Sequence, residues 1–103
     1  MIKGKLIKNV TLKSGAVYDK GADAEIHFDL KNPSRCTLLI SGKEIATRSS
    51  VALQLIGKKS PTVKTMEKWS FDGIAKSVGN STVEPDGWDS KGNPSWLLVF
   101  GYI

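Results

Sequence analysis

Apolar and polar residues alternate in short runs along the first half of the chain. The clearest run spans residues 24–30, where Ala24, Ile26, Phe28 and Leu30 share one side and Glu25, His27 and Asp29 share the other. This period of two is the pattern of a half-buried β-strand. Further short strands are predicted by the branched and apolar residues at 5–12, 16–18, 36–40 and 44–48.

Turn signals separate these runs. Pro33 stands in a tight turn over residues 32–35, and Ser41-Gly42-Lys43 joins residues 36–48 into a hairpin. Residues 51–56 fit either a sixth strand or a short helix. Residues 1–57 are therefore predicted to form a small curled antiparallel sheet or an SH3-like barrel of five or six strands.

The pattern changes to a helical period after residue 60. Ser60 followed by Pro61 is typical of a helix start, and Gly73 favours a helix end. At 100° per residue the apolar side chains gather on one face, which predicts an amphipathic helix of about three turns. Its apolar face holds Val63, Met66, Trp69 and Ser70, and its polar face holds Lys64, Thr65, Lys68 and Asp72.

The last thirty residues predict a hairpin, a loop and a terminal element. Gly79-Asn80 lies between the runs 75–78 and 81–84, which predicts a two-residue hairpin turn with glycine first. A polar loop follows over 85–94, and the apolar run 96–100 predicts a C-terminal strand, with a short buried helix as the alternative. We thus expect one β-rich α+β domain, in which residues 60–103 pack on the sheet of residues 1–57.

The chain has 103 residues and a formal net charge of +5, with thirteen lysines and two arginines. The charge is uneven, because residues 1–20 carry +4 and residues 31–64 carry +6, whereas residues 21–30 and 65–103 are net negative. A basic domain is attracted to polyanions such as nucleic acid, although the same charge also keeps a small domain soluble. The shortage of arginine counts against nucleic acid, because arginine makes the bidentate contacts to bases and phosphates.

Few residues are available for enzymatic chemistry. His27 is the only histidine and is predicted to lie on the surface, and Cys36 begins an apolar strand as an inert core thiol. Glu84, Asp86 and Asp89 lie in or beside a Pro-Asp-Gly turn, where aspartate favours local backbone hydrogen bonds. No nucleophile elbow, cysteine-based zinc site, calcium loop or phosphate-binding glycine loop is present. We expect no enzyme, no metal and no cofactor.

Membrane and export signals are also missing from the pattern. No apolar run reaches the roughly 20 residues of a membrane span. The first residues, Met-Ile-Lys-Gly-Lys, lack the apolar stretch of a signal peptide. A cytoplasmic protein without membrane contact is the resulting expectation.

Residues 65–74 read Thr-Met-Glu-Lys-Trp-Ser-Phe-Asp-Gly-Ile. This run resembles the second helix and exit of excisionase-type and mercury-regulator-type winged helix-turn-helix proteins, in which Thr-x-x-x-Trp-x-x-x-Gly precedes a hairpin wing. Residues 51–57 would be the preceding short helix, and the Gly79-Asn80 hairpin would take the place of the wing. The chain departs from the families at Glu67 and Lys68, where an arginine is usual. The resemblance implies a nucleic-acid-binding or regulatory protein of phage or plasmid type.

Residues 83–98 contain Glu-Pro-Asp-Gly followed by Pro-Ser-Trp-Leu. This C-terminal run is similar to the tail of small uncharacterised bacterial and phage proteins. The similarity implies an origin in a mobile element and no particular activity.

Three functional interpretations stay open. In a nucleic-acid-binding protein, phosphates would be contacted by Lys58, Lys59, Lys64 and Lys68, base edges by Thr65 and Lys68, and a wing strand would carry Lys76. In a protein-interaction module or inhibitor, Trp88 in the glycine-rich loop would be the anchor, unless it covers its own core. The third interpretation is a structural component of a larger assembly.

Overall fold

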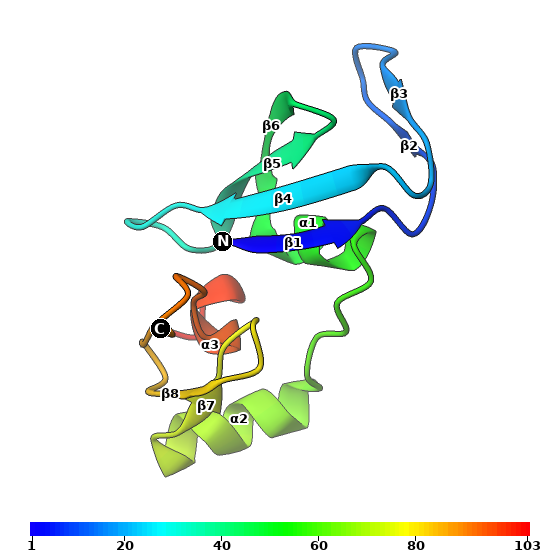
Figure 1. Cartoon of the computed structure of the whole chain (residues 1–103). Coiled ribbons are helices and arrows are strands. Elements are labelled where there is room, and N and C mark those ends of the chain that lie inside the picture. Colours follow the sequence, from blue (N-terminus) through cyan, green and yellow to red (C-terminus); the bar gives the residue numbers. More distant parts are fainter.

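Six short strands and one helix fill the first half of the computed structural model, which describes residues 1–103 (Figure 1). Four strands form an antiparallel sheet in the order β1-β4-β5-β6. Its strands are β1 (Ile2–Lys5), β4 (Asp23–Phe28), β5 (Arg35–Ile40) and β6 (Lys43–Arg48). The strands β2 (Val10–Thr11) and β3 (Val17–Tyr18) form a separate hairpin. The α+β class with antiparallel strands is confirmed, but the sheet is open at β1 and β6 and no closed barrel forms.

The predicted alternation places one face of β4 and β5 in the core. Ile26 and Leu38 are register partners, and they are 0% and 1% exposed. The prediction that this strand extends to Leu30 is wrong, because β4 ends at Phe28 and Leu30 is 79% exposed. The Asp29 carboxylate accepts hydrogen bonds from the backbone N–H groups of residues 31 and 32, at 2.8 and 3.2 Å. This local turn ends the strand.

The predicted hairpin over residues 36–48 is confirmed. Ser41 and Gly42 form its two-residue turn, and both have a positive φ, of 50° and 82°. Two left-handed central residues are the requirement of the type I′ turn, whose twist matches that of paired strands. The turn therefore fixes the register between β5 and β6.

Residues 51–56 belong largely to helix α1 (Ser49–Leu55), which decides between strand and helix. Ala52 and Leu53 are 0% and 1% exposed, and α1 contacts β4, β5 and β6. Ser49 is fully buried, and its hydroxyl donates to the Pro33 carbonyl oxygen at 2.7 Å. Residues 49, 52 and 53 share one helical face, so the apolar run has the period of a helix that covers a sheet.

An extended segment, residues 57–62, leads to helix α2 (Val63–Asp72), which is the predicted amphipathic helix. The predicted start at Ser60 and Pro61 is wrong by two residues, because Thr62 is the N-cap and its hydroxyl accepts from the Thr65 N–H at 3.2 Å. The predicted end is confirmed, since Gly73 is left-handed at φ 72°. Met66 is buried, whereas Val63 is 61% exposed.

The second hairpin pairs β7 (Ala75–Lys76) with β8 (Thr82–Val83). Its predicted two-residue turn is wrong. The Asn80 N–H donates to the Ser77 carbonyl oxygen at 2.9 Å, and Asn80, not Gly79, has the positive φ, of 69°. A type I turn followed by a left-handed residue gives a three-residue hairpin loop, and asparagine tolerates that conformation.

The predicted C-terminal strand is wrong, and the alternative of a short buried helix holds. Helix α3 (Trp96–Val99) is N-capped by Ser95, whose hydroxyl accepts from the Leu98 N–H at 3.2 Å. The run 96–100 has no polar alternation, so its capping serine decides the structure.

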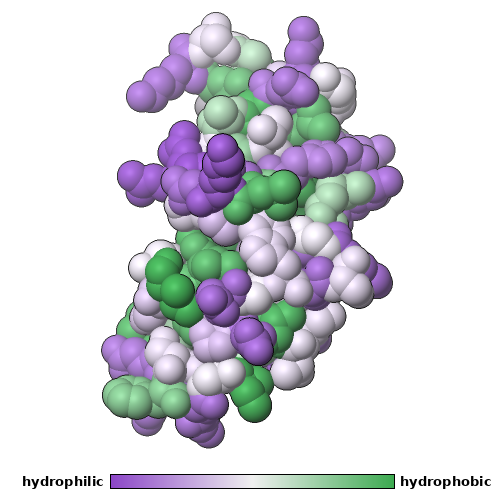
Figure 2. Space-filling view, turned by 90° about the vertical axis from the view of Figure 1, so that its left-hand side faces the viewer, coloured by the Kyte–Doolittle hydropathy of each residue, from purple (hydrophilic) through white to green (hydrophobic).

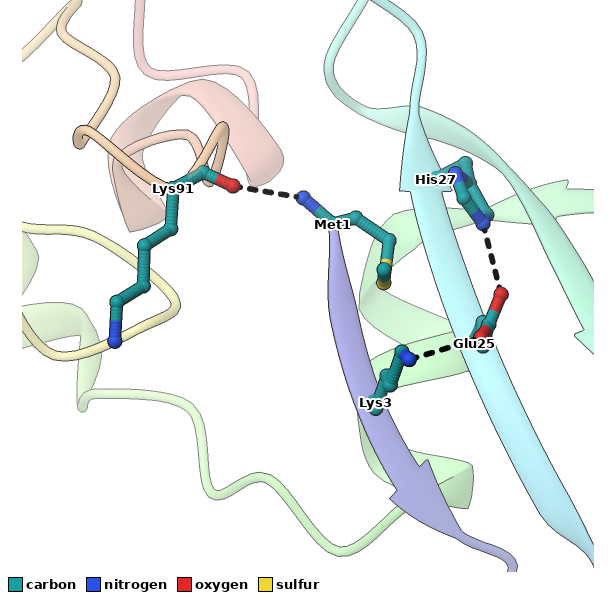
Figure 3. A network of polar contacts seen from close by, with 5 residues as sticks. All are labelled: Met1, Lys3, Glu25, His27 and Lys91. Carbon is teal, nitrogen blue, oxygen red and sulfur yellow. Dashed lines mark hydrogen bonds and ion pairs between the residues drawn. The ribbon is translucent and has the colours of Figure 1, made fainter.

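The two halves of the chain share one apolar core. Residues of the C-terminal half lie in the same cluster as the sheet residues. Its buried members are Leu6, Ala24, Ile26, Phe28, Cys36, Leu38, Ile40, Ala52, Leu53, Val78, Trp96 and Val99. The Met1 amino group also donates to the Lys91 carbonyl oxygen at 3.1 Å (Figure 3) and to the Gly92 carbonyl oxygen at 3.2 Å, which ties the start of β1 to the 85–94 loop. The molecule is elongated, 43 × 24 × 20 Å, with the sheet towards one end and α2 at the other (Figure 1).

The three helices are short. They have seven, ten and four residues, and none could cross a lipid bilayer.

Candidate nucleic-acid interface

Four of the predicted phosphate-binding lysines lie on consecutive parts of the chain. Lys58 and Lys59 belong to the extended segment before α2, and Lys64 and Lys68 lie one turn apart on α2. Lys58 is half-buried and the other three are exposed. We call these four residues the linker–α2 lysines.

None of the linker–α2 lysines forms an ion pair with a carboxylate. All three ion pairs of the molecule lie on the exposed face of β1 and β4. They are Lys3–Glu25 at 3.5 Å, Lys5–Asp23 at 2.7 Å and His27–Glu25 at 3.2 Å, the first and last of which are drawn in Figure 3. Elsewhere no carboxylate oxygen lies within 4.0 Å of a lysine or arginine nitrogen. The positive charge along the linker and α2 is therefore available to an external anion.

Thr65 and Lys76, the other predicted contacts, make local hydrogen bonds. The Thr65 hydroxyl oxygen accepts from the Thr62 hydroxyl at 3.0 Å, beside the helix cap. The Lys76 ammonium donates to Thr82 Oγ1 at 2.9 Å, across the β7–β8 hairpin. Thr65 and Lys76 thus already have side-chain partners within the protein, unlike the four linker–α2 lysines.

The order of helix, helix and hairpin along the chain is the one that the winged helix-turn-helix resemblance implies. The two helices, however, pack on different parts of the molecule. Helix α1 contacts the sheet, whereas α2 contacts α3 and β7. The extended segment separates the two helices in Figure 1. A groove-reading role for α2 stays a prediction, and the contacts of the linker–α2 lysines do not depend on it.

Phe71 of α2 was not among the site residues predicted from the sequence. It is 92% exposed, the highest value among the exposed large apolar residues. A helical wheel would have revealed its position, because Lys64, Lys68 and Phe71 follow each other at i, i+4 and i+7 on one face. Figure 2 shows apolar side chains among the hydrophilic ones on the half of the molecule that holds α2.

Trp88 is half-buried and packs against the main apolar cluster. It also lines an open groove of about 480 Å³ with Ile74, Val83 and Glu84. The indole thus covers part of its own core and leaves one side towards the groove.

Asp89 braces the C-terminal loop. Its Oδ1 accepts from the N–H groups of Lys91 and Asn93, at 2.9 and 3.0 Å, and its Oδ2 accepts from the Ser77 hydroxyl at 2.7 Å. Ser77 Oγ in turn accepts from the N–H groups of Gly79 and Ser81. Partial burial raises the pKa of Asp89, but these hydrogen bonds outweigh it and hold the pKa below its usual value. The carboxylate therefore joins the loop to the hairpin.

The Pro-Ser-Trp-Leu run of the C-terminal resemblance also holds this loop in place. Ser95 is fully buried, caps α3 and donates its hydroxyl hydrogen to the Pro85 carbonyl oxygen. Trp96 and Leu97 are buried directly after it. Each of these residues has a structural role in holding the loop on the core.

His27 and Cys36 lie apart from these features. His27 is exposed, and its hydrogen bond to Glu25 is the main cause of the lowered pKa of that carboxyl. Burial raises the pKa of the Cys36 thiol. No three His, Cys, Asp or Glu side chains gather as they would around a metal ion. Comparisons with protein-family models, curated proteins and solved structures find no match for the chain.

Proposed function

We propose that this protein binds nucleic acid through its phosphates, as a small basic protein of phage or plasmid type in the cytoplasm. The supporting observation is that the linker–α2 lysines have no carboxylate partner and follow one another along the chain. Residues 31–64, which hold three of them, carry +6. The resemblance implies a winged helix-turn-helix over residues 51–84 with an SH3-like sheet behind it, but the proposal rests on the lysines alone, because α1 and α2 contact different parts of the molecule.

Lysine-rich contact favours binding that depends little on base sequence. An ammonium group is a point charge that neutralises a phosphate and releases a counterion, whereas base readout needs donors in a fixed fork. Four phosphate contacts predict that affinity falls on the order of 100-fold between 50 and 200 mM salt.

The test measures the affinity of the full chain for a fluorescent 20-base-pair duplex and a 20-nucleotide single strand by anisotropy. One variant changes all four linker–α2 lysines to glutamine. A matched control changes four lysines outside this surface to glutamine, all of them exposed and unpaired: Lys13, Lys20, Lys31 and Lys43. Each variant lowers the net charge of +5 by four. We expect the first variant to lose at least tenfold in affinity at 50 mM salt and to flatten the salt dependence, and the control to lose much less.

Two results would overturn the proposal. Equal losses in both variants would show that net charge, and not the linker–α2 surface, attracts the ligand. Absence of binding to either oligonucleotide at low salt would remove nucleic acid as the partner. The alternative function, a protein-interaction module or inhibitor, is favoured by the groove of about 480 Å³ in which Trp88 meets Ile74 and Val83.

A further inference from the structure

Phe71 lies on the surface without a packing role. Its side chain is 92% exposed in the last turn of α2, while Met66 on the opposite face is 3% exposed. An aromatic ring outside the core contributes little to folding, because it removes almost no apolar surface from water. A single exposed apolar residue is common, but an aromatic ring beside cations is the combination on which single-stranded nucleic acids stack their bases.

The ring shares its helical face with two free cations. At 100° per residue, Lys64, Lys68 and Phe71 fall within about 60° of one another around the helix axis. A rise of 1.5 Å per residue places Phe71 about 4.5 Å beyond Lys68 and about 10 Å beyond Lys64 along the axis. This face of α2 therefore presents two ammonium groups followed by one aromatic ring, with the carboxylates of Glu67 and Asp72 about 40° to either side.

We propose that Phe71 stacks on an unpaired base and that the preferred ligand is single-stranded nucleic acid. This inference rests on the proposed function and names its substrate class. Lys64 and Lys68 hold the phosphates of the strand, and the ring takes the base beyond them. Bases in a duplex are already stacked on each other, so only an unpaired base offers its face to the ring.

The charge composition agrees with this ligand. Stacking and phosphate contact need no arginine fork, and they accept any base because every base has an aromatic face. A lipid surface fits the helix less well. Membrane-surface helices bury a wide apolar face, whereas Phe71 lies at the end of a face that carries Lys64 and Lys68, and Val63 lies about 100° away from Lys64 around the helix.

The experiment compares wild type with Phe71→Ala, Phe71→Trp and the control Leu30→Ala. Leu30 is also a large apolar residue on the surface, 79% exposed, but it lies in the loop between β4 and β5. Affinities for a 20-nucleotide oligothymidine and a 20-base-pair duplex are measured at 50 mM salt, together with binding to phosphatidylserine vesicles. Thermal unfolding of each variant is recorded, and the Phe71→Ala midpoint is expected to stay at the wild-type value.

We expect wild type to prefer the single strand. Phe71→Ala should weaken single-strand binding by about 5- to 150-fold, the range found when a stacking residue is removed, and change duplex binding less than twofold. Phe71→Trp should keep or raise single-strand affinity, and Leu30→Ala should match wild type.

Three outcomes would overturn the inference. Equal affinity for both oligonucleotides with no effect of Phe71→Ala would remove the stacking role while the proposed function stands. No binding of either oligonucleotide would remove the proposed function and the inference together. A Phe71→Ala variant that loses vesicle binding and keeps single-strand binding would assign the ring to a membrane surface.

Discussion

The side chains buried where β4 meets β5 are apolar, whereas those buried between the β7–β8 hairpin and α3 include three polar residues. The sheet buries Ile26, Leu38 and Ile40 at 0–1% exposure. The C-terminal segment buries Ser77, Asn93 and Ser95 at 0–3% exposure. Both regions are closed to water and the sheet has its backbone hydrogen bonds, but only the second region depends on hydrogen bonds made by buried side chains.

This difference has consequences for substitution. Apolar burial is proportional to area and has no preferred direction, so a core of aliphatic residues tolerates changes that conserve volume. A buried polar group that loses its partner pays the full cost of desolvation. The sheet should therefore respond to changes of size, and the C-terminal segment should respond to changes of a single atom.

The largest effect is expected from Leu38→Ala in the centre of β5. Leu38 is 1% exposed, and its removal leaves a cavity between the sheet and α1, at a cost of about 2–5 kcal/mol in the free energy of unfolding. All three tryptophans, at 69, 88 and 96, lie in the C-terminal half. Because Trp96 shares the core cluster with Leu38, urea unfolding followed by tryptophan fluorescence should show the loss.

A matched measurement by circular dichroism, which reports the whole chain, controls this prediction. The two signals should shift to the same lower midpoint if one core joins both halves. A tryptophan transition that stays at the wild-type midpoint would contradict the shared core.

A smaller effect is expected from Asp89→Asn, which keeps the shape of the side chain but replaces one carboxylate oxygen by an amide nitrogen. The amide NH2 group then faces another donor in either orientation. In one it faces the Ser77 hydroxyl, and in the other it faces the N–H groups of Lys91 and Asn93. The expected loss is about 1–3 kcal/mol in the free energy of unfolding at pH 7, measured by urea unfolding. Asp86→Asn is the control, because Asp86 is exposed in the same loop and its change should be close to neutral.

The pH dependence sharpens this test. The pKa of Asp89 is lower in the folded chain than its usual value, so its contribution is complete above about pH 4 and is lost as the pH falls below it. The stability difference between wild type and Asp89→Asn should therefore shrink from pH 6 to pH 3. A difference that stays constant over this range would show that the carboxylate charge has no part in the brace.

Much of the sheet could be predicted because its strands and turns depend on residues that are close together in the sequence. The alternation of residues 24–28 and the Ser41-Gly42 turn specify β4 and the β5–β6 hairpin locally. The C-terminal brace could not be predicted in the same way, since Ser77 meets Asp89 twelve positions later. Polar residues in a loop give no period, and only the folded chain shows which of them are buried together.

The candidate interface shows the same difference between features set by local sequence and features set by the fold. Helical periodicity was enough to place Lys64 and Lys68 on an exposed face, which the structure confirms. It did not show that Thr65 would be drawn to the Thr62 cap or Lys76 to Thr82, because those contacts depend on where the helix starts and how the hairpin pairs. Nucleic-acid contact by the linker–α2 lysines stays a prediction.

The smallest effect concerns the start of α2, where sequence and structure disagree. The Ser60-Pro61 signal predicts Ser60 as the cap, but Thr62 is the residue whose hydroxyl accepts from the Thr65 N–H, at 3.2 Å. Thr62→Ala should lower the free energy of unfolding by about 0.5–2 kcal/mol, the usual cost of losing an N-cap, whereas Ser60→Ala should change it by no more than a few tenths. Thermal unfolding of both variants, with Ser60 as the matched control, measures the difference. A larger loss in Ser60→Ala would place the helix start where the sequence signal put it, because the side chain that caps the helix is the one whose removal leaves an N–H group without a partner.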